Sequence, residues 1–492
     1  MNILSLFVLV PILMMIALFF SRDMKTIRTV MVAGASILVI LATALTVMFF
    51  QERAVSDAEM LFVSSFKWYP SLNISYTVGV DGISVAMLCL SAIIVFTGVF
   101  SSWNMPMPKE FFLWYCLLSV GVFGFFISID LFTMFMFYEV ALIPMYLLIG
   151  LWGTGRKEYS AMKLTLMLMG GSAFLMVGIV GIYYASGHET MNLIEIAQRH
   201  IPIEFQRWLF PITFLGFGVL GALFPFHTWS PDGHASAPTA VSMLHAGVLM
   251  KLGGYGCFRV AMYLMPEAAH ELGWIFLILT GISVVYGAFS AVVQTDLKYI
   301  NAYSSVSHCG LVLFALLMMN RTAMTGAIMQ MLSHGLMTAL FFALIGLIYG
   351  RTHTRDIREM GGLMKIMPFA AVCYVIAGLA SLGLPGLSGF VAEMTIFVGA
   401  FQNTGVFYTA FTVVACCSIV ITAVYILRTV GKILYGPIQD KHHIGLPDAA
   451  WYEKVSVVVL IIGIAFLGMY PSGASNLIYD SLTPIISKLA LL

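Results

Sequence analysis

Three charged residues lie inside long apolar stretches of the sequence, where an ionised side chain is costly unless it is paired or hydrated. Glu139 is near the middle of LFTMFMFYEVALIPMYLLIG, Lys251 is within VSMLHAGVLMKLGGYGCF, and Glu393 follows the Gly-Leu-Pro-Gly break of LGLPGLSGFVAEM. Ionisable groups in such places are typical of ion and proton pathways. These three residues are therefore the first candidates for a proton-translocation site.

Lys251 is too deep in its apolar stretch for its ammonium group to reach water easily. It follows Pro238 by thirteen residues, which corresponds to about 20 Å along an α-helix that rises 1.5 Å per residue. A desolvated lysine loses its proton more readily, and a nearby carboxylate favours its charged form. Such a residue is suited to relay a proton, while a fixed salt bridge between two helices is the structural alternative.

Five histidines fall within or beside the same apolar stretches. A neutral imidazole can accept a proton on one nitrogen and donate one from the other near neutral pH. Each histidine is therefore either a relay or a buried packing residue, but together with one lysine and two glutamates they predict a hydrated polar axis through the membrane. The five are His227, His234, His245, His308 and His334.

The composition places these residues in a membrane protein. Of the 492 residues, 60% are hydrophobic and only 10% are charged, and the mean hydropathy is +0.97, whereas soluble domains carry about 25% charged residues. The net charge of +1 gives no basic surplus that would favour binding of nucleic acid. The sequence therefore excludes a soluble globular protein and predicts an all-α polytopic protein surrounded by the lipid bilayer.

A membrane-spanning helix needs about 20 mostly apolar residues, and fourteen stretches meet this requirement. The first lacks a basic segment and a cleavage site, so we expect a retained helix rather than a signal peptide. The segments between the spans are too short to form domains with cores of their own. The expected spans are residues 3–20, 29–50, 82–100, 111–128, 131–151, 162–185, 208–228, 238–265, 272–293, 299–319, 323–349, 369–400, 405–435 and 452–470.

The distribution of basic residues predicts the orientation of these helices. If the N-terminus is outside, sixteen of the 24 lysines and arginines fall in inner loops and helix ends, and six fall in outer segments. Basic loops are retained on the cytoplasmic side, and the number of spans is even. We therefore expect both termini on the outer, periplasmic side of a bacterial inner (plasma) membrane.

Two apolar stretches are interrupted at comparable positions in the two halves of the chain. GALFPFHTWSPDGHASAP (221–238) contains Pro225, and LASLGLPGLSGFVAE (379–393) contains Pro385; a proline removes a helix hydrogen bond and clashes with the preceding turn. Paired discontinuous helices are typical of inverted-repeat transporters with a site at the membrane midplane. The expected units are N-terminal helices over 1–110, repeats over 111–265 and 272–435, and a C-terminal loop and helix over 436–492.

The remaining motifs give no support for a cofactor or metal in this chain. The seven cysteines are scattered, and none has the CxxC or Cys/His spacing of a zinc or iron–sulfur site. The string GFGVLG (216–221) matches a dinucleotide fingerprint, but it lies in a membrane span with no preceding strand, which favours helix packing through small residues. Any electron transfer is therefore expected in other subunits.

Five segments resemble the antiporter-like subunits of NADH:quinone oxidoreductase (respiratory complex I), most closely the M type. The resemblance covers essentially the whole chain, and the superfamily also includes Mrp-type antiporters and membrane-bound hydrogenases. It implies two inverted five-helix repeats with discontinuous helices 7 and 12. The segments are FYEVALIPMYLLIGLWG (137–153), FPFHTWSPDGHASAPTAVSMLHAGVLMKLGGYG (224–256), DLKYINAYSSVSHCGLVL (296–313), QMLSHGLMTALFF (330–342) and GLPGLSGFVAE (383–393).

The resemblance also implies a role for each buried ionisable residue. Glu139 matches the glutamate of the family's Glu/Lys pair, Lys251 its central lysine, and Glu393 its terminal acid. His308 and His334 match the histidines of the family's polar axis. These positions therefore imply a proton route that crosses both repeats.

The sequence departs from the family at one position of this route. The family's lysine on helix 7, seven residues before His227, is replaced by Leu220, and a leucine cannot pair with the carboxylate of Glu139. Two alternatives remain. Either a histidine takes the place of the lysine, namely His227 beside the broken helix or His245 on the next span, or the first repeat is inactive.

The function implied by the resemblance is outward proton translocation by a membrane subunit of respiratory NADH:quinone oxidoreductase. Other membrane-arm subunits, including neighbouring antiporter-like subunits, are the implied partners, and FMN, iron–sulfur clusters, NADH and quinone are implied in partner subunits only. A subunit of an Mrp-type Na⁺/H⁺ antiporter or of a membrane-bound hydrogenase would use the same residues. A structural scaffold, in which the charges only lock helices together, is the third alternative.

Overall fold

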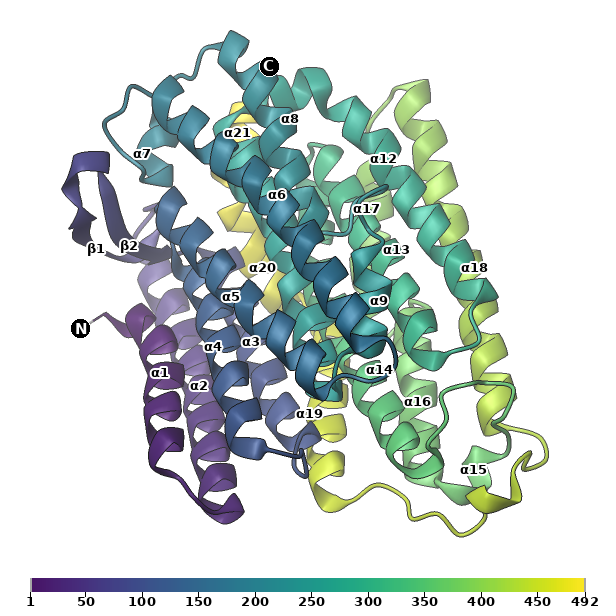
Figure 1. Ribbon diagram of the computed structural model, residues 1–492. Coiled ribbons are helices and arrows are strands. Elements are labelled where there is room, and N and C mark those ends of the chain that lie inside the picture. Colours follow the sequence, from purple (N-terminus) through teal and green to yellow (C-terminus); the bar gives the residue numbers. More distant parts are fainter. Residues whose placement is uncertain (1, 491–492) are drawn as a thin grey trace.

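The computed structural model describes residues 2–490, most of which are helical. Within these residues, eleven helices are long and apolar enough to cross a membrane. Most run roughly parallel or antiparallel to one another through the bundle (Figure 1). They are α1 (Ile3–Phe20), α2 (Met24–Arg53), α3 (Gly82–Ser101), α4 (Pro108–Ile127), α5 (Leu131–Trp152), α6 (Lys157–Ala185), α12 (Pro266–Val293), α13 (Leu297–Leu317), α14 (Arg321–Thr352), α18 (Val406–Leu434) and α19 (Trp451–Met469).

Three further spans are divided into shorter elements. The seventh consists of α8 (Ile203–Leu220) and α9 (Trp229–Ser236), and the twelfth of α16 (Pro368–Ser381) and α17 (Ser388–Ala400). The eighth is a continuous helical run with two π-helical segments. With the eleven continuous helices these make fourteen spans, which confirms the predicted fold class. The elements of the eighth span are α10 (Thr239–Leu244), η2 (His245–Leu249), α11 (Met250–Gly256) and η3 (Cys257–Met262).

Both predicted interruptions lie where the prolines indicated them. In the twelfth span, Gly383 and Gly386 flank Pro385 with φ angles of +67° and +94°, a region that favours glycine because it has no Cβ. In the seventh span, the N–H of Phe224 donates to Ser283 Oγ on α12 at 2.8 Å. A neighbouring helix therefore satisfies backbone that the break leaves without a helical partner, as buried irregular backbone requires.

The connections between helices define two ends of the bundle (Figure 1). The end that we call the hairpin face carries an antiparallel pair of strands, which the sequence did not indicate, together with short C-terminal helices. The opposite end, which we call the loop face, carries the connections from α1 to α2, α3 to α4, and α5 to α6. The short elements are β1 (Leu61–Tyr69), η1 (Pro70–Leu72), β2 (Ile74–Val80), α7 (Leu193–Gln198), α20 (Pro471–Ser481) and α21 (Thr483–Leu489) towards the hairpin face, and α15 (Leu363–Ile366) and η4 (Lys441–His443) towards the loop face.

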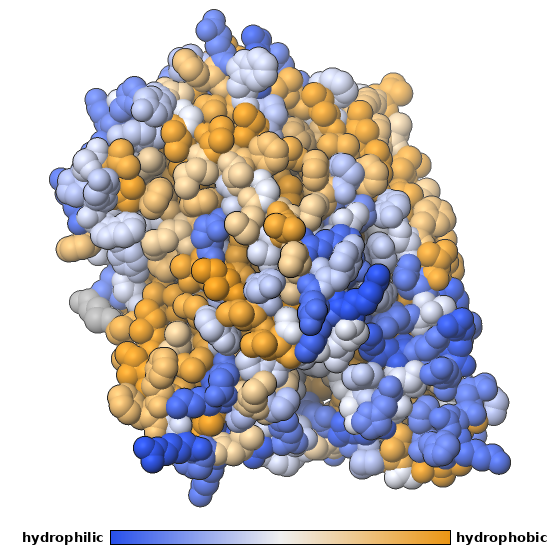
Figure 2. Space-filling view, in the orientation of Figure 1, coloured by the Kyte–Doolittle hydropathy of each residue, from blue (hydrophilic) through white to orange (hydrophobic). Residues whose placement is uncertain are grey.

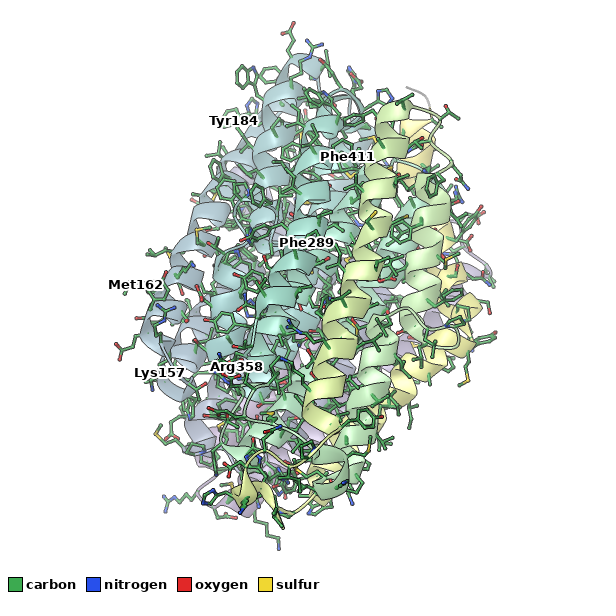
Figure 3. The ribbon with its side chains drawn as sticks, turned by 90° about the vertical axis from the view of Figure 1, so that its right-hand side faces the viewer. Lys157, Met162, Tyr184, Phe289, Arg358 and Phe411 are labelled. Carbon is green, nitrogen blue, oxygen red and sulfur yellow. The ribbon has the colours of Figure 1, made fainter. Side chains whose placement is uncertain are left out.

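The surface and interior of the bundle differ in the way a membrane protein requires. Figure 2 shows hydrophobic residues over the left and upper parts of one side, and hydrophilic residues at the two ends and over the lower right. Seen from another side, Phe289 lies near mid-height and Phe411 above it, whereas Lys157 and Arg358 lie lower, towards the loop face (Figure 3). The most enclosed helices are α13 and α14, each with 94% of its most apolar window buried. These two helices carry the candidate histidines at positions 308 and 334, so the candidate site is at the centre of the molecule.

Candidate functional site

Four ionisable side chains from four helices form a continuous row, which we call the central row. Lys251 on α11 places Nζ 2.6 Å from Nδ1 of His334 on α14. The ring of His334 lies 5.2 Å from that of His308 on α13, measured between centroids. His308 Nδ1 in turn lies 3.6 Å from Oε1 of Glu393 on α17. The structure therefore joins one lysine, two histidines and one glutamate that the sequence separates widely.

All four members of the central row are buried, with exposed fractions of 8% or less. A charged lysine can donate to an unprotonated His334 Nδ1, and Lys251 Nζ also donates to the carbonyl of Ala246. Nε2 of both His308 and His334 is buried without a hydrogen-bond partner. A buried imidazole nitrogen without a partner has unused capacity to donate or accept a proton, so the row is chemically suited to proton transfer.

A small cavity lies beside Lys251 and next to the broken seventh span. Its volume of about 10 Å³ is close to the minimum that holds one water molecule. Gly221, the first residue after α8, and Cys309, adjacent to His308, are among the residues that line it. A single water could therefore hydrate the lysine from the side of the helix break.

Two glycines allow the helices of the central row to approach closely. A Cβ on Gly335 would lie 2.7 Å from the carbonyl oxygen of Gly247, and a Cβ on Gly247 would lie 3.2 Å from that of Gly335. Contacts this short leave no space for a side chain, so the eighth span and α14 meet backbone to backbone. Because Gly335 follows His334 directly, this contact brings the imidazole within reach of Lys251.

A pair of buried histidines, His234 on α9 of the seventh span and His245 on the eighth span, adjoins the central row. The rings of His234 and His245 are 4.2 Å apart, and both residues are fully buried. His234 Nε2 lies 3.2 Å from the sulfur of Met250, the residue before Lys251, while neither nitrogen of His245 has a partner. Trp229 stacks on His245 at 5.3 Å. Sequence reasoning identified His234 only as one of five buried histidines, because its ring contact is not visible from spacing.

A buried lysine that was not among the candidate residues lies between these histidines and the loop face. Lys298 near the start of α13 is 4% exposed, and its Nζ donates to the carbonyl of Ala237 at 2.6 Å. Arg355 Nε lies 3.1 Å from Asp296 Oδ2, and its guanidinium also donates to Ala235 O at 2.7 Å. These contacts tie α13 to the end of α9, and the only sequence signal for them was the DLK triplet at the start of the span.

His227 lies apart from the central row, in the break between α8 and α9. It is 3% exposed, and its Nδ1 has no hydrogen-bond partner. Its ring stacks on Phe224 at 5.6 Å and meets Tyr286 edge-on at 4.9 Å. A separate ion pair joins the same region to α6, with Lys163 Nζ 2.7 Å from Oδ2 of Asp232.

Glu139 also stands apart from the row, on the partly buried side of α5. Its Oε1 is buried without a hydrogen-bond partner, and among residues 2–490 no basic nitrogen forms an ion pair with it. Leu220, where the family has a lysine, is fully buried. The structure thus brings neither His227 nor His245 into an ion pair with Glu139, and a histidine substitute for the lysine has no contact to support it.

The comparisons with known proteins agree with this architecture. The profile of the family described as "NADH:quinone oxidoreductase/Mrp antiporter, TM" matches residues 128–422. NADH-quinone oxidoreductase subunit M of Rickettsia bellii is 32% identical over 494 residues, with 99% of both chains covered. NAD(P)H-quinone oxidoreductase chain 4 3 of Picosynechococcus is 37% identical and covers 89% of this chain and 86% of its own length.

Solved structures share the fold over nearly the full length. A chain of respiratory complex I from Thermus thermophilus with bound NADH has a TM-score of 0.88 at 25% identity, covering 98% of this chain and 99% of its own. The Mrp complex from Dietzia matches with a TM-score of 0.86 at 20% identity, covering 99% of this chain and 98% of its own, which concerns the fold alone. With its fourteen spans and buried row of ionisable residues, the chain therefore belongs to the NADH:quinone oxidoreductase/Mrp antiporter transmembrane family, as an antiporter-like membrane subunit of the M type.

Proposed function

We propose that the chain is the proton-translocating subunit M of an NADH:quinone oxidoreductase. The observation that carries this proposal is the central row, in which Lys251, His334, His308 and Glu393 follow one another through the enclosed centre of the bundle. Intramembrane ionisable groups are expensive to bury and mark ion pathways. A scaffold that needed only locked helices would not require two histidines with unpartnered nitrogens between a lysine and a glutamate.

The proton enters from the loop face in this proposal. Asp296, Arg355 and Lys298 form a polar connection from that face to the end of α9. The buried pair of His234 and His245 continues it towards Lys251. Water has to bridge the steps that these contacts leave open, as it does in hydrated proton paths. Entry along the eighth span then leads to the lysine at its middle.

Transfer from the lysine proceeds sideways along the central row. Protonated Lys251 gives its proton to His334 Nδ1 across their hydrogen bond, and His334 then releases a proton from Nε2 towards His308. His308 Nδ1 lies 3.6 Å from Glu393 Oε1 but accepts from the amide nitrogen of Gln330 at 3.0 Å. In this proposal the Gln330 bond therefore opens before Nδ1 passes a proton to the carboxylate, which is the terminal acceptor. Glu393 passes the proton to the outer side or to a neighbouring subunit. Redox energy released in partner subunits drives the sequence by changing the charge state at one end of the row.

Glu139, near the middle of α5, is the coupling residue in this proposal. Its unpaired carboxylate is partly buried on α5, so a change of nearby charge has a large effect on it. Because position 220 is a leucine in this chain, the change of charge near Glu139 cannot come from a lysine on its seventh span. The signal must then reach Glu139 from another side chain or from an adjacent membrane subunit.

The architecture proposed for this route consists of two repeats and a defined orientation. Residues 111–265 and 272–435 form the repeats, and each contains one discontinuous span. The loop face lies inside the cell and the hairpin face outside, with both termini on the outer side of a bacterial inner membrane. Neighbouring antiporter-like subunits flank the chain, while FMN, iron–sulfur clusters and the sites for NADH and quinone belong to partner subunits.

Purification of the intact assembly in a mild detergent tests the proposed function. We expect flavin and iron–sulfur subunits to co-purify with this chain and the assembly to oxidise NADH with quinone as acceptor. Recovery of small antiporter subunits alone, with sodium-dependent proton exchange in the absence of NADH, would contradict the proposal and favour an Mrp-type antiporter. Recovery of a hydrogenase module would also contradict the proposal and would favour a subunit of a membrane-bound hydrogenase.

A further inference from the structure

The eighth span carries four polar residues at a spacing of four between Lys251 and the hairpin face. They are Lys251, Tyr255, Arg259 and Tyr263. On a regular α-helix, a spacing of four drifts by about 40° per step, so that Tyr263 would be rotated by about 120° from Lys251. The π-helical segment η3 covers residues 257–262 and counteracts this drift, because its turns contain more residues. The helix can therefore direct the four side chains along one side.

Arg259 forms a buried ion pair at the hairpin-face end of this line. Its guanidinium donates to Asp81, and the two residues are 3% and 1% exposed. Asp81 is also the N-cap of α3, where Oδ1 accepts from the Ser84 N–H at 2.8 Å. The hydroxyl of Tyr255 lies 2.8 Å from Ser84 Oγ, and the guanidinium carbon lies 5.5 Å from the centre of the Tyr255 ring. The cation is therefore fixed in position by the start of α3.

The surroundings of this ion pair are closely packed. Phe125 and Phe126 meet the ring of Tyr255 edge-on at 5.9 and 5.3 Å. The N–H of Gly82 donates to Ser481 Oγ on α20 at 2.8 Å, and a Cβ on Gly82 would lie only 1.9 Å from a backbone oxygen of α20. The cavity beside Lys251 is lined by none of these residues. The cavity beside Lys251 therefore gives way, towards the hairpin face, to a closely packed region that contains a buried ion pair.

A second polar layer covers the ion pair on the hairpin face. The hydroxyl of Tyr263 donates to Glu59, which precedes β1. Lys488 of α21 places Nζ 4.3 Å from the centre of the Tyr263 ring and donates to the carbonyl of Ala197 at 2.5 Å. Segments from the N-terminal third, the middle and the C-terminus of the chain therefore meet over the end of the eighth span.

We propose that the buried Arg259–Asp81 pair is a proton barrier that closes the hairpin-face end of the eighth span. This inference rests on the proposed function, in which Lys251 carries protons. Arg259 follows Lys251 by eight residues, or about 12 Å along a helix. A fixed guanidinium at that distance in a dry region repels a proton that moves outward from the lysine, as arginines do in selective pores. The proton is thereby directed sideways to His334.

Passive proton leak through the assembled complex in vesicles, measured without NADH under an imposed pH gradient, tests the barrier. Arg259→Gln leaves the Asp81 anion alone and is expected to raise the leak about tenfold, because the loss of one positive charge 12 Å from the lysine changes the energy of the proton by about 1.4 kcal/mol, which corresponds to that factor. Asp81→Asn retains the cation and removes its counter-charge, so the leak is expected not to rise. Arg351→Gln breaks the 2.5 Å ion pair with Glu453 near the loop face and is the matched control.

The difference in proton leak between Arg259→Gln and Asp81→Asn distinguishes a proton barrier from an ion pair that only holds helices together. An equal leak from Arg259→Gln and Asp81→Asn, or no leak from either, would overturn the proposal. Loss of NADH-driven pumping in Arg259→Gln without any leak would also overturn it, since the pair would then be part of an exit route. If Arg259→Gln fails to assemble, two other variants test the barrier. The double variant Arg259→Gln/Asp81→Asn is expected to raise the proton leak, and Arg259→Lys is expected to keep it at the wild-type level. Wild-type complex that does not pump would refute the proposed function instead.

Discussion

Nζ of Lys251 and Nδ1 of His334 lie 2.6 Å apart, although 83 residues separate them in the sequence. Only one of the two atoms can hold the shared proton at a time, because a hydrogen bond needs one donor and one acceptor. The contact therefore couples the protonation of the eighth span to that of α14. This coupling is the step on which the proposed sideways transfer depends.

His334→Gln is expected to stop transfer at this step without removing the polar contact. A glutamine can accept a hydrogen bond from Lys251, but it cannot take up and release a proton. We expect the part of NADH-driven pumping that passes through this subunit to fall by about a hundredfold, the scale of an acid–base group, with normal assembly of the complex. Pumping at the wild-type rate would show that the proton does not pass through His334.

Glu393→Gln is expected to block the far end of the central row. The amide keeps the size of the carboxyl group 3.6 Å from His308 Nδ1, but it cannot accept a proton. Glu393→Asp keeps the acid on a shorter side chain and is the matched control, for which we expect partial pumping. Initial rates of vesicle acidification check both variants. Equal rates in the two variants would contradict a role of the carboxylate as acceptor.

A double-mutant cycle tests whether position 220 faces Glu139, as the family resemblance implies. Leu220→Lys buries an ammonium group, and pairing with Glu139 would offset part of its cost. We expect Leu220→Lys to destabilise the protein more in a Glu139→Gln background than alone, with a coupling energy of about 2 kcal/mol. Thermal unfolding of the purified complex measures the four variants. Purely additive effects would place the two side chains out of contact.

Cysteine labelling tests the proposed orientation. Lys67 on β1 and Lys441 near the loop face are both exposed, so a cysteine at either position is accessible to a reagent that cannot cross the membrane. We expect Lys67→Cys to be labelled in intact cells and Lys441→Cys only in inverted vesicles. The parent chain without either substitution is the control. The opposite labelling pattern would show that the chain has the inverted topology and that the proposed direction of transport is wrong.

Asp130 is expected to stabilise the hairpin face through two elements at once. It caps α5 by accepting from the N–H groups of Phe132 and Thr133 at 3.0 Å, and it accepts from the Ser75 N–H of β2 at 3.0 Å. Asp130→Ala should lower the free energy of unfolding by about 2 kcal/mol, from the lost cap and the lost inter-element bond. Thermal unfolding measures the effect, and a loss of less than half this size would contradict it.

Asp23→Ala provides the comparison for that measurement. Asp23 caps α2 through Thr26 at the surface, and the hydrogen bonds from Thr26 hold the pKa of its carboxyl group below the usual range. Because the folded-state pKa is lowered, the stabilisation is present above the unfolded-state pKa and is lost as pH falls through the folded-state value. We expect a smaller effect than for Asp130→Ala, since no second element is attached.

The spans and the two broken helices could be predicted from the sequence because they depend on local properties. About 20 apolar residues are needed to cross a bilayer, and Pro225 and Pro385 each remove a helix hydrogen bond, although Pro11, Pro144 and Pro211 lie within continuous helices. The strand pair over 61–80 was missed, since its residues are mostly exposed on β1 and give no alternating pattern. The π-helical segments of the eighth span were missed as well, because no residue type specifies them.

The contacts within the site could be predicted less completely than its residues. Lys251, Glu393, His308 and His334 stood out because ionisable groups are rare in apolar stretches. Which of them meet could not be read from the sequence, since helices that are apolar on all sides give no directional pattern. The Arg259–Asp81 pair was also missed. Asp81 lies at the start of a helix, where an aspartate is expected as an ordinary N-cap.

The most direct test of the account is the number of protons pumped per electron by the purified complex carrying Lys251→Met, reconstituted in vesicles. Methionine keeps the apolar part of the side chain and removes the group that takes up the proton. We expect a lower ratio than in the wild type, because the protons that pass through this subunit are lost while other subunits continue to pump. An unchanged ratio at an unchanged rate of NADH oxidation would contradict the central claim that Lys251 carries protons.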